Sequence, residues 1–212
     1  MGCLSYPTGF TVQGISPESN INKRYSLEIS LDNSRTKKTA TIIMMNPSKA
    51  NQNCSDQTVN KVLNFFKDNS KIPISKVIIL NLFPYYENDS KKLVNRIKSI
   101  NSNELQENID VFTKHISESD FIVLAWGNVP KGFCAKIHNA YVKKTMNIIE
   151  ITLKQDILYV FKDDKFAANE IITKKQRPRH PNRITLNNLY KIQNYSYNRE
   201  LLKFSFENNL SK

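Results

Sequence analysis

Three short polar motifs contain the side chains of this sequence that are best suited to chemistry, and two of them directly follow apolar, strand-like runs. The motifs occupy residues 46–48, 81–84 and 177–181. In an open α/β sheet, ligands bind beyond the carboxyl ends of the strands, so polar side chains placed there usually converge on one site. Amides can orient water or read a hydrogen-bonding edge, and a neutral imidazole can donate to a developing negative charge. Asn46, Asn81 and His180 are therefore the leading candidates.

Each of these three residues also has a purely structural interpretation. Asn46 precedes Pro47 after an apolar run and can bond its own backbone in a turn, and Asn81 has the same alternative. A single histidine is more often structural than catalytic, but His180 lies in a basic loop bracketed by prolines, which favours function. His115 falls on a predicted helix, and we interpret it, like His138, as structural.

Further candidates surround the motifs. Asp56 is the nearest carboxylate after the first motif, so it is a candidate general base, although it can equally cap a helix. Trp126 is expected to form the floor of a pocket or part of the core. Polar and basic residues that flank the motifs are candidates for phosphate contacts, although isolated basic residues are commonly only solvated. These candidates are Ser48, Lys49, Lys131, Arg177, Arg179 and Arg183.

Apolar patterning predicts the elements that position these residues. Nearly continuous apolar runs over 40–45, 75–80 and 119–126 are typical of strands buried on both faces, and 24–31 alternates like a strand with one buried side. Helical spacing over 56–66, 90–100, 104–116 and 132–144 predicts helices, and 148–153 and 157–161 have the length of strands. Strands that alternate with helices predict an α/β fold with a mostly parallel sheet and right-handed crossovers.

The chain has 212 residues, which suits one domain with a substantial core. We expect a single domain over 1–212, with a core at about 24–190 and a basic, aromatic tail over 191–212 whose fold the sequence does not predict. No stretch approaches the apolar length of a membrane helix, and the N-terminus does not resemble a signal peptide.

Charge and cysteine content suggest the partner and the compartment. Thirty-one Lys and Arg against nineteen Asp and Glu give a net charge of +12 and a pI near 9.5, so we expect a nucleic-acid partner; a solvated, lysine-rich surface is the alternative. Three widely spaced cysteines argue against both a disulfide framework and a zinc site. We therefore expect a cytoplasmic protein that uses neither a metal nor another cofactor.

The motifs also carry a resemblance to known proteins. Six of them, in order over roughly 24–190, resemble a widespread bacterial and phage family of unknown function. They are Arg24–Leu27, Met45–Ser48 with Ala50, Ser55–Thr58, Asn81–Phe83, Ala125–Gly127 and Pro178–Pro181. More remotely, the chain resembles the uracil-DNA glycosylase superfamily, in which strand ends carry an Asn-Pro or Asp-Pro motif, a base-reading Asn and a Leu-Trp-Gly motif, and a late loop contains His-Pro. This resemblance implies a three-layer αβα sandwich.

The second resemblance also implies roles for individual residues. Asn46 corresponds to the residue that positions the attacking water, and because an amide cannot act as its base, Asp56 is the candidate for that task. His180 corresponds to the histidine that hydrogen-bonds the departing base. Asn81 corresponds to the residue that reads the flipped base, on which one of the nearby aromatic residues Phe83, Tyr85 and Tyr86 is expected to stack.

Our leading hypothesis is therefore a monomeric DNA N-glycosylase that flips out and excises a modified or damaged base, with a role in defence against phages that carry modified DNA. Two departures weaken the case for uracil itself: Met44-Met45 replaces a leading glycine in the first motif, and Asn182-Arg183 follows His180-Pro181. A catalytically silent nucleic-acid-binding module and a hydrolase of free nucleosides or nucleotides are the alternatives.

Overall fold

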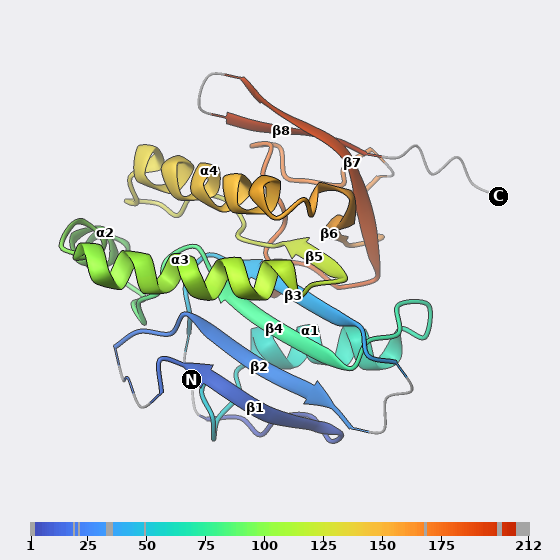
Figure 1. Cartoon of the computed structure of the whole chain (residues 1–212). Coiled ribbons are helices and arrows are strands. Elements are labelled where there is room, and N and C mark those ends of the chain that lie inside the picture. Colours follow the sequence, from blue (N-terminus) through green and yellow to red (C-terminus); the bar gives the residue numbers. More distant parts are fainter. Residues whose placement is uncertain are drawn as a thin grey trace.

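The computed structural model describes residues 3–18, 20, 22–32, 36–48, 50–167, 169–198 and 201–206. Its strands form one eight-stranded sheet in the order β1-β2-β4-β3-β5-β6-β7-β8 (Figure 1). The strands are β1 (Phe10–Ser16), β2 (Ser26–Leu31), β3 (Thr39–Met44), β4 (Lys76–Asn81), β5 (Phe121–Leu124), β6 (Leu158–Lys162), β7 (Asn188–Asn198) and β8 (Leu201–Phe206). The helices are α1 (Gln57–Asp68), α2 (Ser90–Lys98), α3 (Ser102–Ser117) and α4 (Ala135–Ile151), with short 3-10 turns η1 (Gln155–Ile157) and η2 (Pro181–Arg183).

The four central strands run parallel, and the outer strands do not. Strands β4, β3, β5 and β6 pair in parallel, whereas β1, β2, β7 and β8 join them through antiparallel pairings. The α/β class is therefore confirmed, but the sheet is mixed, and the expected parallel arrangement holds only at its centre.

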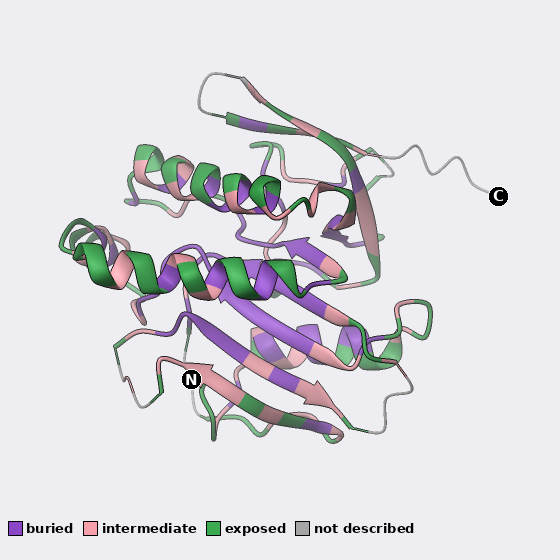
Figure 2. Ribbon diagram, in the orientation of Figure 1, coloured by how far each residue is buried: buried purple, intermediate pink, exposed green. Residues whose placement is uncertain are grey.

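Helices on both sides of the sheet explain the continuous apolar runs of the central strands. Neighbouring residues of β3 face opposite sides, as the pleat of a strand requires: Ile42 packs in a core with Val62 and Leu63 of α1, whereas Ile43 packs in a core with Phe112 of α3 and Met146 of α4. Figure 2 shows the buried central strands between α1 and the pair α3 and α4. A strand whose two faces are both covered by helices does not need to alternate apolar and polar residues.

Helix α4 is longer than predicted. The expected strand over 148–153 is wrong, because residues up to Ile151 continue the helix, with Met146 and Ile149 buried three residues apart on one face. The helix also begins later than expected, since Gly132 lies before it with a φ of +82°. In the tail, β7 and β8 form an antiparallel hairpin, and residues 199–200 and 207–212 lie outside the described residues.

A disulfide joins Cys3 to Cys54, so the expectation of no disulfide is wrong. The backbones of Leu4 and Ser55 pair in a short antiparallel bridge, which places the two cysteines side by side although 51 positions separate them in the sequence. Such a contact depends on how the N-terminal segment folds back, which cysteine spacing does not reveal. Within the described part of the chain, no helix is long and apolar enough to cross a membrane.

Candidate active site

A cavity of about 740 Å³ lies at the carboxyl ends of the parallel strands. The connection after β3 leads through α1 to β4 on one side, whereas the connection after β5 leads through α4 to β6 on the other. Adjacent strands whose connections diverge in this way leave a crevice between them, where ligands of α/β proteins usually bind. The cavity is lined by residues 45–46 after β3, 126–130 after β5 and parts of the segment 166–184 after β6.

Asn46 lines this cavity with an amide of fixed orientation. Its Nδ2 donates to the carbonyl oxygen of Glu87 at 2.9 Å and to that of Pro47 at 3.3 Å. Both amide hydrogens are thus engaged by the backbone, so the side chain offers its carbonyl oxygen Oδ1 as an acceptor. An acceptor in this position can orient a water molecule but cannot take its proton.

His180 lines the same cavity as a neutral imidazole. Its Nδ1 accepts the backbone N–H of Asn182 at 3.2 Å, which caps η2 and leaves the ring proton on Nε2. Burial and, to a smaller extent, the charge of Arg183 lower the pKa of His180 to about 4, although the carboxylate of Asp56 opposes the shift. At neutral pH the ring is therefore an uncharged donor.

Gly127 allows the His180 loop to lie against the end of β5. Its φ of +77° is in the left-handed region, and a Cβ added to it would lie 2.9 Å from the Cβ of His180. Only glycine satisfies both conditions without strain. The glycine of the Trp-Gly motif thus sets the position of the histidine.

Trp126 and the segment after β6 complete the walls. Trp126 is only 1% exposed and lines the cavity, and its Nε1 has no hydrogen-bond partner among the described residues. Arg179 stacks on Phe166, with its Cζ 3.6 Å from the ring centroid, and donates to the carbonyl oxygens of residues 170, 171 and 172. Arg179 therefore holds this segment together in addition to facing the cavity.

Exposed cations form the rim of the cavity. Lys174, Lys175 and Arg183 line it, opposed by a single carboxylate among its lining residues, that of Glu170. Lys131 is exposed but is not a lining residue, and Lys49 lies outside the described residues. The net charge of the rim is positive, which favours an anionic ligand.

Asn81 does not line the cavity. It is 1% exposed at the end of β4, and its Oδ1 accepts a hydrogen bond of 3.1 Å from Nη2 of Arg24, which is itself 1% exposed. Nη1 of Arg24 donates to the carbonyl oxygen of Ala50 at 2.5 Å. Within the described residues, Nδ2 of Asn81 and Nε of Arg24 have no acceptor.

Three further candidates are buried away from the cavity. Phe83 is fully buried, with ring centroids 5.0 Å from Phe133 and 4.8 Å from Tyr141, and Tyr85 is 8% exposed. Arg177 is 6% exposed and donates to Oδ1 of Asn139, and burial lowers its pKa. In this conformation none of the three can contact a ligand in the cavity.

Asp56 is engaged as a helix cap. Its Oδ1 accepts the backbone N–H groups of Thr58 and Val59 at 2.7 and 2.9 Å, and its Oδ2 accepts the hydroxyl of Ser48. The capping interpretation is thus confirmed, and the Ser48 hydroxyl is directed at this carboxylate. Asp56 still acts on the site electrostatically, because its charge raises the pKa of His180.

The arrangement combines an acceptor amide, a neutral imidazole donor and a cationic rim. It suits a reaction in which a leaving group departs with negative charge and water attacks without a strong base. Among the described residues, no group of three or more His, Cys, Asp and Glu side chains is placed to hold a metal ion.

Sequence reasoning missed several residues that line the site or support it from the core. Arg24 was part of a motif without a role, and its partner Asn81 lies 57 positions away. Nothing in the sequence marked Phe166 as a site residue, because a single aromatic residue in a loop forms no recognisable motif. The pair Lys174-Lys175 gave a usable signal, since it directly precedes the basic motif 177–181.

Comparison with known proteins gives one assignment. No curated protein and no solved structure shows significant similarity to the chain. A family model described as a protein of unknown function, DUF1643, matches residues 24–182, the span that contains all the cavity residues that follow β3 and β5. Because the match covers most of the chain, the chain belongs to the DUF1643 family.

Proposed function

We propose that this protein is a DNA N-glycosylase. The observation that supports this proposal best is the placement of Asn46 and His180 around one cavity above the buried Trp126, with His180 held neutral and protonated on Nε2. A base that leaves a sugar takes the bonding electron pair with it, and an Nε2–H donor can stabilise that developing anion.

The same residues suggest how water attacks. The Oδ1 of Asn46 accepts a hydrogen bond from a water molecule and so orients it toward the sugar, which has gained oxocarbenium character as the base departs. No carboxylate is needed as a strong base, because bond cleavage runs ahead of water attack. The reaction is slower than with a general base, because an amide only orients the attacking water.

The architecture is compatible with the remote resemblance to uracil-DNA glycosylases. We propose that helices on both faces of the sheet make a three-layer αβα sandwich of that kind, with Asn46-Pro47, Trp126-Gly127 and His180-Pro181 at corresponding strand ends and loop. The two departures remain, Met44-Met45 in place of a glycine and Asn182-Arg183 after the histidine motif. They favour a modified or damaged base over uracil.

Charge supports DNA as the substrate. The net charge of +12 and the cations Lys174, Lys175 and Arg183 on the rim attract a phosphate backbone without reading its sequence. We propose a monomer that acts in the cytoplasm, where phage or damaged genomic DNA is encountered. Because an enzyme that excises a modified base would damage phage DNA that contains this base, we propose a role in defence against such phages.

The test is base release, measured by mass spectrometry of the small-molecule fraction after incubation with unmodified, uracil-containing, deaminated and hypermodified phage DNAs. Wild type is expected to release one base, and Asn46→Ala and His180→Ala are each expected to slow release by about 10²–10³-fold while retaining DNA affinity. The matched control is Asn53→Ala, which removes an exposed amide outside the cavity. Absence of any released base or abasic site across the panel contradicts the proposal.

A nucleic-acid-binding module is the second candidate, and the burial of Asn81 and Phe83 away from the cavity favours it. Such a module binds DNA with an affinity that falls steeply with salt and falls further in Lys174→Ala and Lys175→Ala, without releasing a base. The same assay is also run on free nucleosides and nucleotides. Cleavage of these alone, without release of a base from DNA, identifies a hydrolase of free nucleosides or nucleotides.

A further inference from the structure

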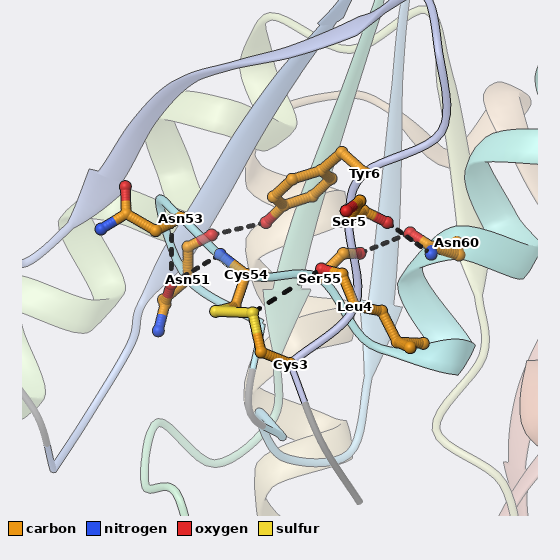
Figure 3. Close-up of a disulfide and its surroundings, with 9 residues drawn as sticks. All are labelled: Cys3, Leu4, Ser5, Tyr6, Asn51, Asn53, Cys54, Ser55 and Asn60. Carbon is orange, nitrogen blue, oxygen red and sulfur yellow. Dashed lines mark hydrogen bonds between the residues drawn. A yellow bond between two sulfur atoms is a disulfide. The ribbon is translucent and has the colours of Figure 1, made fainter.

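A disulfide and hydrogen bonds join the N-terminal segment 3–6 to the loop 51–56 between β3 and α1. We propose that Cys3 and Cys54 form a reversible thiol–disulfide site that fixes this loop at the N-terminus of α1. Figure 3 shows the disulfide and the side chains around it. This proposal is independent of the glycosylase proposal, because it concerns the order of the loop and not the reaction.

Besides the disulfide, hydrogen bonds join the two segments, and Tyr6 also packs against the core that contains Ala50 and lies near Asp56. The backbones of Leu4 and Ser55 exchange two, of 3.2 and 2.7 Å, and the hydroxyl of Tyr6 donates to the carbonyl oxygen of Asn51 at 2.6 Å (Figure 3). Leu4 is 42% exposed, so little apolar area is buried there. Water competes with such bonds at an exposed site, and each contributes only modestly to stability. The covalent link therefore adds a constraint on the loop with which water cannot compete.

The loop and its flanks carry groups that organise the site. Asp56 ends the loop, caps α1 through the N–H groups of Thr58 and Val59, and raises the pKa of His180. Just before the loop, the carbonyl oxygen of Ala50 accepts a hydrogen bond from the buried Arg24. A change in the order of the loop is thus transmitted to the helix terminus and to the cavity.

The position of the cysteines suits exchange with small thiols and disulfides. Cys3 is exposed and Cys54 is half-buried. A thiolate of one cysteine attacks oxidised glutathione, which forms a mixed disulfide and releases one glutathione thiolate; the second cysteine then displaces the other glutathione. Two electrons pass from the protein thiols to the glutathione disulfide, and the protons of the two thiols pass to the two glutathiones released. Reduced glutathione reverses the exchange.

The chain provides its own control for this proposal. Cys134 is an exposed, free cysteine that precedes α4, so Cys134→Ser removes a thiol without affecting the clamp formed by segments 3–6 and 51–56. Cys3→Ser and Cys54→Ser each remove the disulfide while keeping a small polar side chain. Comparison of the two variants separates loss of the bond from a local effect at either position.

The test is amide hydrogen exchange, followed by mass spectrometry, on full-length protein equilibrated with oxidised or reduced glutathione. We expect the oxidised protein to be lighter by two hydrogen atoms, and reduction to speed exchange in 51–56 and at Thr58 and Val59 by about tenfold or more. Cys3→Ser and Cys54→Ser should exchange like reduced wild type in either buffer, and Cys134→Ser should behave like wild type.

Two results overturn the proposal. One is a protein that retains its Cys3 and Cys54 thiols in oxidised glutathione. The other is equal exchange at Thr58 and Val59 in the two redox states, because a merely local disulfide would loosen only the residues next to the cysteines. Neither measurement requires catalysis, so the result stands whether or not a base is released from DNA.

Discussion

At the scale of single residues, the least usual feature is the buried guanidinium of Arg24. Arg24 is 1% exposed, and its hydrogen bonds go to neutral acceptors: Oδ1 of Asn81, the carbonyl oxygen of Ala50 and the hydroxyl of Tyr86. Burial lowers its pKa, and the nearby Tyr86, Asp56 and Tyr6 act in the opposite direction. Because a buried cation is costly without acceptors, Asn81 contributes to the stability of the fold as well as to any recognition.

Asn81→Leu should therefore destabilise the protein. The substitution removes the acceptor of Nη2 from a buried cation, and we expect the free energy of unfolding to fall by about 2–3 kcal/mol. Asn81→Asp is the matched variant, because it keeps an acceptor and adds a charge of opposite sign, and it should lose much less at neutral pH. Urea unfolding of the three proteins measures both effects. Equal stability of Asn81→Leu and wild type would show that Arg24 finds another acceptor.

At the scale of elements, the end of β5 and the loop before η2 depend on one glycine contact. Gly127→Ala introduces a Cβ 2.9 Å from that of His180 at a φ of +77°, whereas Gly132→Ala meets nothing within 4 Å at a φ of +82°. Both variants incur the backbone cost of about 1–2 kcal/mol, but only Gly127→Ala should also displace His180. NMR titration of His180 checks this: its pKa should rise toward the ordinary value in Gly127→Ala and remain low in Gly132→Ala.

The sequence predicted the elements that are defined by strong local patterns. The strands at 40–45 and 75–80 were predictable because a strand covered on both faces must be apolar throughout, and their ends located Asn46 at the cavity. The end of α4 was not, because Ile148–Ile151 suits a strand as well as a helix in isolation. The disulfide and the Arg24–Asn81 pair depend on contacts across more than 50 positions, which no local pattern encodes.

At the scale of the whole molecule, the protein combines a high positive charge with buried, neutral histidines. His138 on α4 is fully buried against Phe83 and Phe133, and both of its ring nitrogens lack partners among the described residues. Burial, with a smaller effect of Arg177, lowers its pKa to about 4, the same value that His180 has. Both rings are uncharged in the folded protein but can be protonated in the unfolded chain, so the free energy of unfolding depends on pH.

Acidification should therefore destabilise the protein in a defined range. Between pH 6.5 and about 4 the unfolded chain binds protons that the folded protein excludes, so stability is complete above pH 6.5 and declines as the pH falls through that range. One pKa unit corresponds to about 1.36 kcal/mol, so His138 alone should account for roughly 3 kcal/mol by pH 4.

The variant His138→Leu separates this histidine from the other acid-sensitive groups. Leucine keeps the site apolar and does not titrate, so the free energy of unfolding, measured in urea from pH 7.5 to 4, should decline less steeply than in wild type. The remaining slope then reports His180, the buried His115, whose pKa burial also lowers, and the carboxylates that accept hydrogen bonds. One of these carboxylates is Asp163, whose pKa is lowered by its bonds to Lys165 and Thr185 in spite of burial. Parallel curves for the two proteins would mean that His138 is protonated in the folded state, with water or an acceptor beside its ring.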